Sequence, residues 1–186
     1  MTFGAEGDII GTRCEMICYS KYVSPLGAIT LAGDNDALTG LWFDGQKYFP
    51  SLLSCSEKDL PLFGQVRDWL ERYFRGENPP IDFPIRTEGS PFRQQVWKLL
   101  RTIPYGKTVT YAHIAHVLGT ATGKTCAAQA VGGAIGHNPI SIVIPCHRVV
   151  GTNGALTGYA GGLDKKYFLL QLEGADLNQL HFPKNV

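Results

Sequence analysis

The chain has 186 residues, of which 44% are apolar and 18% are charged, and its formal net charge is +1. This composition is typical of a globular protein with one large or two small cores, and it excludes disordered and fibrous classes. No apolar run approaches the roughly 20 residues that cross a bilayer. Acidic Glu6 and Asp8 stand where a signal peptide would be basic. We therefore expect a cytoplasmic protein with no membrane partner.

The cysteines are odd in number and irregularly spaced, at positions 14, 18, 55, 126 and 146. This pattern argues against a disulfide framework and fits a reducing compartment. Cys14 and Cys18 have no matching second pair, so we expect no metal site there.

The charge is distributed unevenly along the chain. Residues 1–88 hold 8 Lys/Arg against 13 Asp/Glu, whereas residues 89–186 hold 9 against 3 and all five histidines. Prolines between Asn78 and Pro84 interrupt any regular element near this change. We therefore predict two domains, 1–88 and 89–186. The basic second domain suits a polyanion, with ordinary solvated surface as the alternative interpretation.

The first domain is expected to be a small α/β unit. Apolar runs between turn residues predict strands at 17–23, 27–31 and 38–43. These strands are followed by an amphipathic helix, which is expected to end at Gly76. Its apolar stripe consists of Val66, Trp69, Leu70, Tyr73 and Phe74. This domain carries no chemical motif in its sequence.

Three helices are predicted in the second domain. The first has Ser90 as its N-cap and stops before Pro104. The second spans about 111–118, with Thr110 as N-cap and Gly119 as terminator.

The third predicted helix spans 126–135, with Thr125 as N-cap. The second and third helices have the pattern of a helix-turn-helix, although an αα-hairpin within a core has the same pattern. The third helix is almost free of bulky side chains, which suits either close helix packing or close approach to a narrow DNA groove. Gln129 is its one long polar side chain. The small residues are Ala127, Ala128, Ala130, Gly132, Gly133 and Ala134.

A cysteine beside a histidine follows an apolar run. The β-branched residues of 140–144 predict a short buried extended segment that leads through Pro145 to Cys146. Because apolar surroundings raise the pKa of a thiol, Cys146 needs a base to become a nucleophile. His147 is the nearest base, directly or through water, and Glu173 could orient its imidazole. A buried structural Cys/His pair is the alternative interpretation.

Several ordered blocks resemble one known family. Pro145-Cys146-His147-Arg148 and the blocks around it resemble the O6-alkylguanine-DNA alkyltransferases, also called methylated-DNA--protein-cysteine methyltransferases. The resemblance is specific from about Ser90 to Gly174 and weaker before. It implies an α/β (α+β) fold, with a ribonuclease H-like first domain and a helix-turn-helix in the second. The blocks are 91–97, 103–111, 132–134, 138–139, 145–148, 158–163 and 169–174.

The resemblance also implies a reaction. Cys146 would accept the alkyl group from O6 of guanine by direct displacement and keep it as an irreversible thioether, without a cofactor. His147 would act through water as its base, and Glu173 would orient His147. Asn138 would support the turn that carries the thiol. Tyr111 would donate a proton to the departing guanine.

The implied partner is double-stranded DNA that contains O6-alkylguanine. The helix-turn-helix would enter the minor groove, and the damaged base would flip into a pocket whose volume decides whether O4-alkylthymine is also a substrate. We expect a monomer. The implied DNA- and base-binding residues are Ala127, Ala128, Gln129, Arg148, Val149, Tyr159, Ala160 and Lys166; for Arg148, structural pairing elsewhere is the favoured role.

One residue departs from the family pattern. Gln129 stands where the family commonly has an arginine that replaces the flipped base, so we expect intact chemistry with weaker DNA binding. Two other classes remain as alternatives, namely a non-catalytic helix-turn-helix DNA-binding protein and a cysteine hydrolase.

Overall fold

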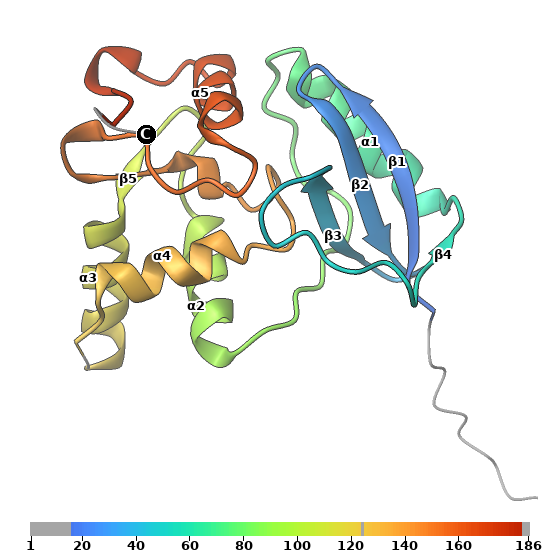
Figure 1. Cartoon of the computed structure of the whole chain (residues 1–186), viewed down its shortest axis with the longest axis horizontal. Helices are drawn as coiled ribbons and strands as arrows, with labels where there is room; N and C mark the ends of the chain where they lie inside the picture. Colours follow the sequence, from blue (N-terminus) through green and yellow to red (C-terminus); the bar gives the residue numbers. More distant parts are fainter. Residues whose placement is uncertain (1–15, 124, 184–186) are drawn as a thin grey trace, which may run out of the picture.

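The computed structural model describes residues 16–123 and 125–183. A small sheet with one helix lies beside a mainly helical part, which confirms the predicted α+β class (Figure 1). Among the described residues, no helix is long and apolar enough to cross a membrane.

The sheet has four strands in the order β3-β2-β1-β4. Strands β1 (Cys18–Ser24), β2 (Gly27–Gly33) and β3 (Leu38–Phe43) are antiparallel neighbours, while β4 (Ser56–Glu57) is parallel to β1. The three predicted strands are confirmed with shifts of one or two residues at their ends. The two-residue β4 was missed because it is too short to show alternation.

Helix α1 (Pro61–Phe74) covers one face of the sheet, with its predicted apolar stripe turned inward (Figure 1). Phe63, Val66 and Leu70 are fully buried. Gly76, with a φ of +85°, follows the helix as predicted. The same buried cluster continues into the helical part, so one apolar core holds both parts together.

The helical part begins with α2 (Pro91–Leu100) and α3 (Tyr111–Thr122). Both predicted N-caps are confirmed, because the hydroxyls of Ser90 and Thr110 accept hydrogen bonds from backbone N–H groups three residues on. Two predicted ends are wrong. The first helix was expected to include Ile103 and stop at Pro104, but α2 ends at Leu100, before the buried Ile103. The second was expected to end at Gly119, but α3 continues through Gly119 to Thr122.

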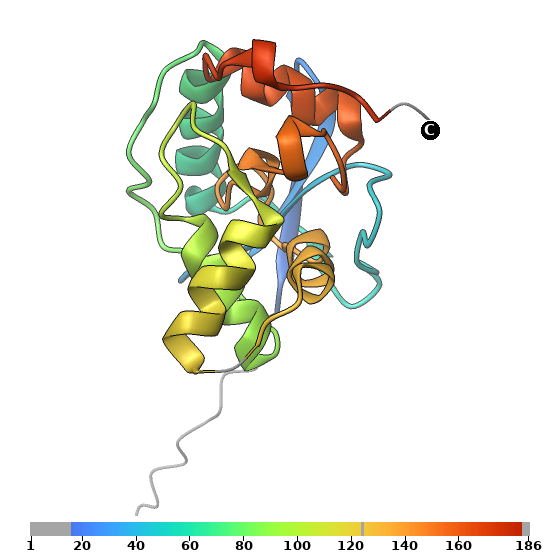
Figure 2. The same ribbon diagram turned by 90° about the vertical axis from the view of Figure 1, so that its left-hand side faces the viewer.

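Helix α3 ends where Gly123 adopts a φ of +65°. A glycine inside a helix costs only about 1 kcal/mol, which packing against neighbours offsets. Helix α4 (Ala128–Gly136) follows after a short connection, and α3 and α4 lie side by side (Figure 2). The predicted Thr125 cap is wrong, since Ala127 occupies the N-cap position without a side-chain bond.

Two short strands bring distant segments together. Strand β5 (Val109–Thr110) pairs in parallel with β6 (Val149–Val150). Because β5 leads directly into Tyr111 and β6 directly follows Arg148, this pairing sets the start of α3 beside the Cys146 segment. Three 3₁₀ turns, η1 (Cys146–Arg148), η2 (Thr152–Gly154) and η3 (Leu177–Gln179), and helix α5 (Leu163–Leu172) complete this part.

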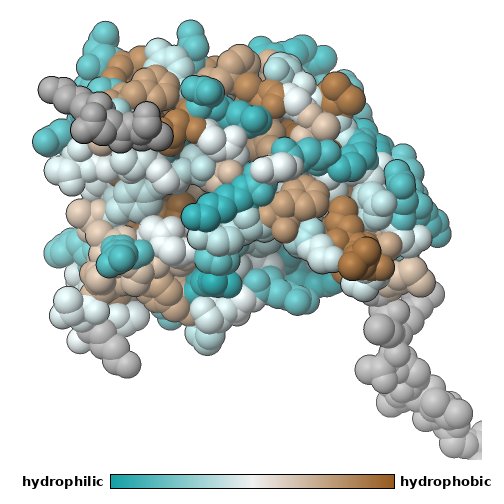
Figure 3. All heavy atoms as spheres, in the orientation of Figure 1, coloured by the Kyte–Doolittle hydropathy of each residue, from teal (hydrophilic) through white to brown (hydrophobic). Residues whose placement is uncertain are grey.

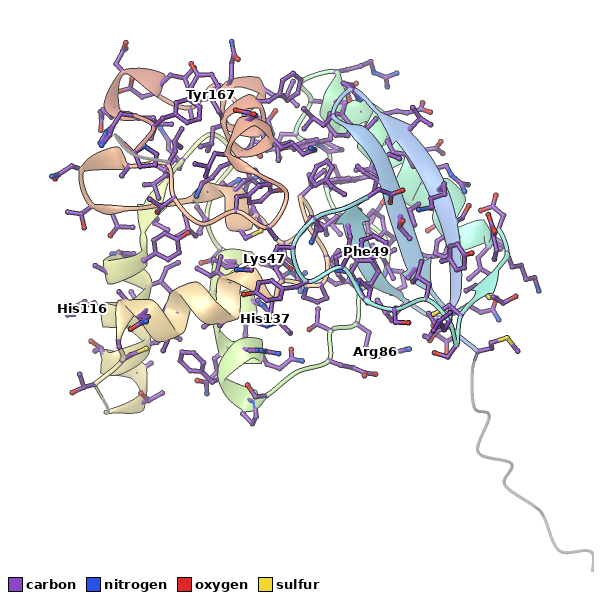
Figure 4. All side chains as sticks on the ribbon, in the orientation of Figure 1. Lys47, Phe49, Arg86, His116, His137 and Tyr167 are labelled. Atoms are coloured by element: carbon purple, nitrogen blue, oxygen red, sulfur yellow. The ribbon has the colours of Figure 1, made fainter. Side chains whose placement is uncertain are left out.

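The loop after β3 joins the two parts at the surface. The ring of Tyr48 stacks on His137 with centroids 4.0 Å apart, and the backbone N–H of Lys47 donates to the carbonyl of Ala160 at 3.0 Å. Figure 4 labels Lys47 and His137 where this loop meets the end of α4.

Candidate active site

Cys146 stands at the end of a tight buried turn, not after the extended segment predicted for 140–144. The N–H of Val143 donates to the carbonyl of Ser141 at 2.8 Å, and Ile142 between them has a φ of +68°. This conformation is strained for a β-branched residue. The prediction failed because tertiary contacts overrode the β propensity of these residues. Their burial was correctly predicted.

Asn138 holds this turn together. Its Nδ2 donates to the carbonyl of Ile144 at 2.8 Å and to Sγ of Cys146 at 3.1 Å, while its Oδ1 accepts from the N–H of Ile140 at 3.1 Å. A strained turn persists only where surrounding contacts determine it. Asn138 supplies three such contacts from a position that is itself buried.

Cys146 is buried, with 3% of the residue exposed. Burial raises its pKa above 9.0, although the hydrogen bond from Asn138 and the charge of Lys166 oppose this rise. The thiol therefore stays protonated at neutral pH until a base removes its proton.

His147 and Glu173 form a fully buried pair. Nε2 of His147 lies 2.7 Å from Oε1 of Glu173. Burial lowers the pKa of His147 below 6.5, with the charges of Arg148 and Lys166 acting in the same direction and Glu173 opposing. A neutral imidazole beside a carboxylate carries its proton on the nitrogen that faces the carboxylate. We therefore assign the proton to Nε2.

That assignment leaves Nδ1 of His147 as an acceptor. Nδ1 is buried and has no hydrogen-bond partner among the described protein atoms. A buried unpaired nitrogen is costly, so a water or substrate that fills this position would be well bound.

Glu173 is the most heavily bonded side chain of the site. Burial alone would raise its pKa, but the hydrogen bonds and charges of His147 and Arg148 lower it far below 4.5. Its Oε2 accepts from Nε of Arg148 at 2.8 Å and from the N–H of Gly106 at 3.1 Å. Gly106 has a φ of +70°, and a Cβ there would lie 2.5 Å from the carbonyl oxygen of Glu173. Only glycine fits that approach.

The guanidinium of Arg148 is turned into the protein and its side chain is only 11% exposed. Its Nη2 donates to Oε1 of Glu173 at 3.0 Å, and its Nη1 donates to the carbonyl of Ile103 at 2.6 Å. With Nε also bonded to Glu173, the guanidinium is committed inside the protein. The structural pairing favoured from the sequence is the role that the contacts support.

Lys166 is buried and ties two segments together. Its Nζ donates to the carbonyl of Val149 at 2.5 Å and to that of Thr157 at 2.6 Å. Burial lowers its pKa from 10.5 to about 8, and the nearby Cys146 opposes the shift. Lys166 therefore joins the segment after the thiol to the 155–162 loop and supplies positive charge beside Sγ.

Tyr111 enters the site from the start of α3. Its hydroxyl donates to the carbonyls of Thr157 and Gly158, both at 3.0 Å. Burial, followed by the effect of Cys146, raises the pKa of this phenol to about 12. The hydroxyl is therefore protonated at neutral pH and can act as a donor near the thiol.

The remaining predicted base-binding residues lie in the 149–160 region. The carbonyls of Val149 and Ala160 already accept hydrogen bonds, from Lys166 and from the N–H of Lys47. Each carbonyl oxygen retains a second lone pair. The hydroxyl of Tyr159 is buried close to Ser141 but makes no hydrogen bond of normal geometry among the described residues.

The first turn of helix α4 presents its small residues to solvent, whereas Ala134 is buried. Ala127, Ala128 and Gln129 are exposed, whereas Val131 and Ile135 face the core. The indole N–H of Trp97 in α2 anchors the buried side by donating to the carbonyl of Ala134 at 3.0 Å. In Figure 3, mostly white and pale brown spheres cover the region of α4, as small residues should.

Two participants were not foreseen from the sequence. The hydroxyl of Tyr73 in α1 donates to Oε1 of Glu173 at 2.7 Å, and the backbone of Gly106 donates to Oε2. Tyr73 had only been placed in the apolar stripe of its helix. A hydroxyl at a core position was the one available signal, because a buried tyrosine usually finds a polar partner.

No group of three or more His, Cys, Asp or Glu side chains that could hold a metal ion occurs within 16–123 and 125–183. Cys14 lies outside the described residues, so the Cys14/Cys18 spacing is not tested. The other four cysteines are free thiols.

Comparison with known proteins identifies relatives along most of the chain. The family model of the 6-O-methylguanine DNA methyltransferase ribonuclease-like domain matches residues 17–87, and that of the corresponding DNA binding domain matches 91–175. A methylated-DNA--protein-cysteine methyltransferase of Mycolicibacterium paratuberculosis is 49% identical over 158 residues, which cover 85% of this chain and 93% of the relative. The protein of that name from Haemophilus influenzae is 42% identical over 156 residues, which cover 83% of this chain and 85% of the relative.

Solved structures agree with these relatives. The crystal structure of Mycobacterium tuberculosis OGT in complex with DNA has a TM-score of 0.76 and 41% identity, and the match covers 88% of this chain and 94% of that one. A crystal structure of the O6-methylguanine methyltransferase from the same organism has a TM-score of 0.75 and 44% identity, and the match covers 88% of this chain and 98% of that one. Shared sequence, fold and both family domains thus lead to one conclusion: the chain belongs to the 6-O-methylguanine DNA methyltransferase family.

Proposed function

We propose that the chain repairs alkylated DNA by moving the alkyl group from O6 of guanine onto its own Cys146. The observation that carries this proposal is a buried thiol held between Asn138 and the positive charge of Lys166, next to a histidine whose tautomer is fixed by Glu173. The names of the relatives give methylated DNA as the substrate and a protein cysteine as the acceptor, and the matching family models name 6-O-methylguanine. The thiol is consumed once, because a thioether has no leaving group that water displaces at neutral pH.

The geometry supports a balanced proton path. A water on Nδ1 of His147 would take the proton of the thiol and pass it to the imidazole. The thiolate of Cys146 then attacks the alkyl carbon, so that an S–C bond forms while the C–O6 bond breaks. The carboxylate of Glu173 stabilises the resulting imidazolium, as in other oriented histidine bases.

Tyr111 is the proposed acid for the leaving group. Its hydroxyl stays protonated, since its pKa is raised to about 12, and Cys146 is close enough to contribute to that rise. Transfer of its proton lets guanine depart neutral, and the strongly basic tyrosinate regains a proton from solvent. The imidazolium of His147 returns the thiol's proton to solvent, so the overall products are a neutral guanine and an alkylated Cys146.

The proposed partner is duplex DNA, bound in the minor groove by a single copy of the chain in the cytoplasm. The exposed small residues of α4 allow the backbone close to a narrow groove. The target nucleotide would flip out of the stack into the site, at a cost of a few kcal/mol for unstacking. Val149, Tyr159, Ala160 and Lys166 are proposed to form the base pocket, since Tyr159 and Lys166 lie close enough to Cys146 for their charges to interact with it.

The proposal is tested by incubating the wild-type chain with a duplex containing O6-methylguanine and analysing its tryptic peptides by mass spectrometry. We expect the peptide that contains Cys146 to gain one methylene mass, with no more than one methyl group per chain. A hydrolase would give multiple turnovers and an unmodified thiol. Either of those results would overturn the assignment.

Gln129→Arg is expected to tighten binding to duplex DNA and to steepen its salt dependence. Gln129 is exposed on α4, and an added cation at a DNA interface releases about one more counterion, which changes the slope of log K against log salt by roughly 0.9. Fluorescence anisotropy with a labelled duplex at several salt concentrations measures both quantities. Gln65→Arg, an exposed change on α1, is the matched control. An unchanged slope in Gln129→Arg would contradict the placement of this residue at the DNA.

A further inference from the structure

The described residues place a tyrosine from the sheet-bearing part inside the catalytic hydrogen-bond network. Tyr73 lies near the end of α1, 100 residues before Glu173, and is 1% exposed. Its hydroxyl donates to Oε1 of Glu173 at 2.7 Å and lies 3.5 Å from Nε2 of His147. Oε1 of Glu173 therefore faces both the imidazole and the phenol.

The ring of Tyr73 is held rigidly in this position. It stacks on Trp69 with centroids 5.3 Å apart and an interplanar angle of 12°, and it meets the edge of Tyr105 at 6.2 Å. The indole N–H of Trp69 is fixed in turn by the carbonyl of Pro79 at 3.1 Å. Side chains locked by such packing keep a hydrogen bond aligned.

Packing alone does not account for the hydroxyl. A phenylalanine would fill the same apolar stripe, and burying a hydroxyl is unfavourable unless it is bonded. The bond it makes goes to the oxygen that also accepts from His147 and from Nη2 of Arg148. Each donor withdraws negative charge from that oxygen, so each one weakens the stabilisation of an imidazolium by Glu173.

We propose that Tyr73 is a positioning residue for alkyl transfer: it aims Glu173 at His147 and keeps the imidazole neutral until the thiol gives up its proton. Through it, the part of the chain that carries the sheet sets the basicity of a histidine in the other part. This inference rests on the roles proposed for His147 and Glu173 in the preceding section.

The groups that surround His147 come from several elements, and only one of them is changed by the test. Glu173 follows α5, Lys166 lies in α5, and Cys146 and Arg148 flank His147 in η1. Tyr73 approaches from α1. A shift in the titration of His147 on removal of one hydroxyl is therefore assigned to that hydroxyl.

Tyr73→Phe is expected to slow single-turnover methyl transfer at neutral pH by about tenfold, a part of the roughly 10²–10⁴-fold that a positioned base contributes. It should also move the acid limb of the rate against pH to higher pH, because the carboxylate is freer to stabilise the imidazolium. ¹⁵N resonances of the His147 ring should report the same upward shift. Binding to an unmodified duplex should not change.

Tyr105→Phe is the matched control. The hydroxyl of Tyr105 donates weakly to the carbonyls of Gly76 and Leu172, at 3.3 and 3.4 Å, and does not bond to Glu173. Its removal should leave the acid limb unchanged. An equal shift in both variants, or a slower Tyr73→Phe with an unmoved acid limb, would reduce Tyr73 to packing and overturn the inference.

A measurement on the wild-type chain guards against a poorly folded variant. A phenol bonded to a buried carboxylate should give a slowly exchanging downfield proton resonance that disappears in Tyr73→Phe, and its absence in wild type would also overturn the inference. Failure of the wild-type chain to methylate Cys146 would instead overturn the proposed function, so the two failures are distinguishable.

Discussion

Cys146→Ser is expected to abolish alkyl transfer while leaving the affinity for DNA within about twofold of wild type. A serine hydroxyl has a far higher pKa than a thiol, and the neutral His147 is too weak a base to ionise it. The side chain is buried and does not lie on the exposed face of α4. Methyl transfer from labelled duplex measures the first effect, and anisotropy with the same duplex measures the second.

Cys55→Ser supplies the matched control for the cysteine substitution. Cys55 is a half-buried free thiol beside β4, in the other part of the chain. The Cys55→Ser variant should accept one methyl group per chain on Cys146 at the wild-type rate. Residual transfer by Cys146→Ser would show that another cysteine accepts the group. Loss of DNA affinity together with transfer would show that the substitution disturbs the fold.

Glu173→Gln is expected to cost about 3–5 kcal/mol of folding stability, the usual effect of removing one partner from a buried ion pair. Arg148 would lose its counter-charge while its side chain remains only 11% exposed. Alkyl transfer should fall by about 10²-fold or more, because an amide stabilises no imidazolium. Urea denaturation and single-turnover kinetics measure the two effects. Glu77→Gln, which removes an exposed ion pair with Arg72, should change stability by less than about 1 kcal/mol.

The same variant should respond differently to acid. The pKa of Glu173 is lowered in the folded state from 4.5, so its contribution to stability is present above that pH and is lost as the pH falls toward the folded value. Burial lowers the pKa of His147 below 6.5 in the folded state. As the pH falls, His147 is therefore protonated in the unfolded chain before it is protonated in the folded one, and the free energy of unfolding decreases. Wild type should lose stability steeply below about pH 5, whereas Glu173→Gln should have a shallower acid slope. Equal slopes would contradict the placement of the charge on Glu173.

Several features were accessible to the sequence because they depend on neighbours in the chain. The caps of α2 and α3, the apolar stripe of α1 and the small residues of α4 follow from backbone preferences and side-chain size over a few positions. Cys146 and His147 are adjacent. Glu173 was proposed from the chemistry of the Cys/His pair and the role of Asn138 from the resemblance, and the structure places Asn138 at the thiol and Glu173 at the imidazole.

Other features failed where packing outweighed local preference. Gly119 did not end α3, which packs against α4 and continues to Thr122. The isoleucines at 140–144 did not extend, because Asn138 and backbone hydrogen bonds fold them into a turn. Thr125 did not cap α4, because Ala127 occupies the N-cap position there. In the first two cases a contact with a distant segment decided the conformation.

The sequence by itself determined which thiol to expect as the acceptor: Cys146 precedes a histidine within ordered blocks that resemble one family. Only the tertiary structure decided what makes this cysteine and histidine usable, since Tyr73, Gly106 and Arg148 converge on Glu173 from three separate segments. Local sequence encodes short-range hydrogen bonds and helix faces. The protonation of a buried pair depends on charge and donors brought together by the whole core, and no short stretch of chain contains them.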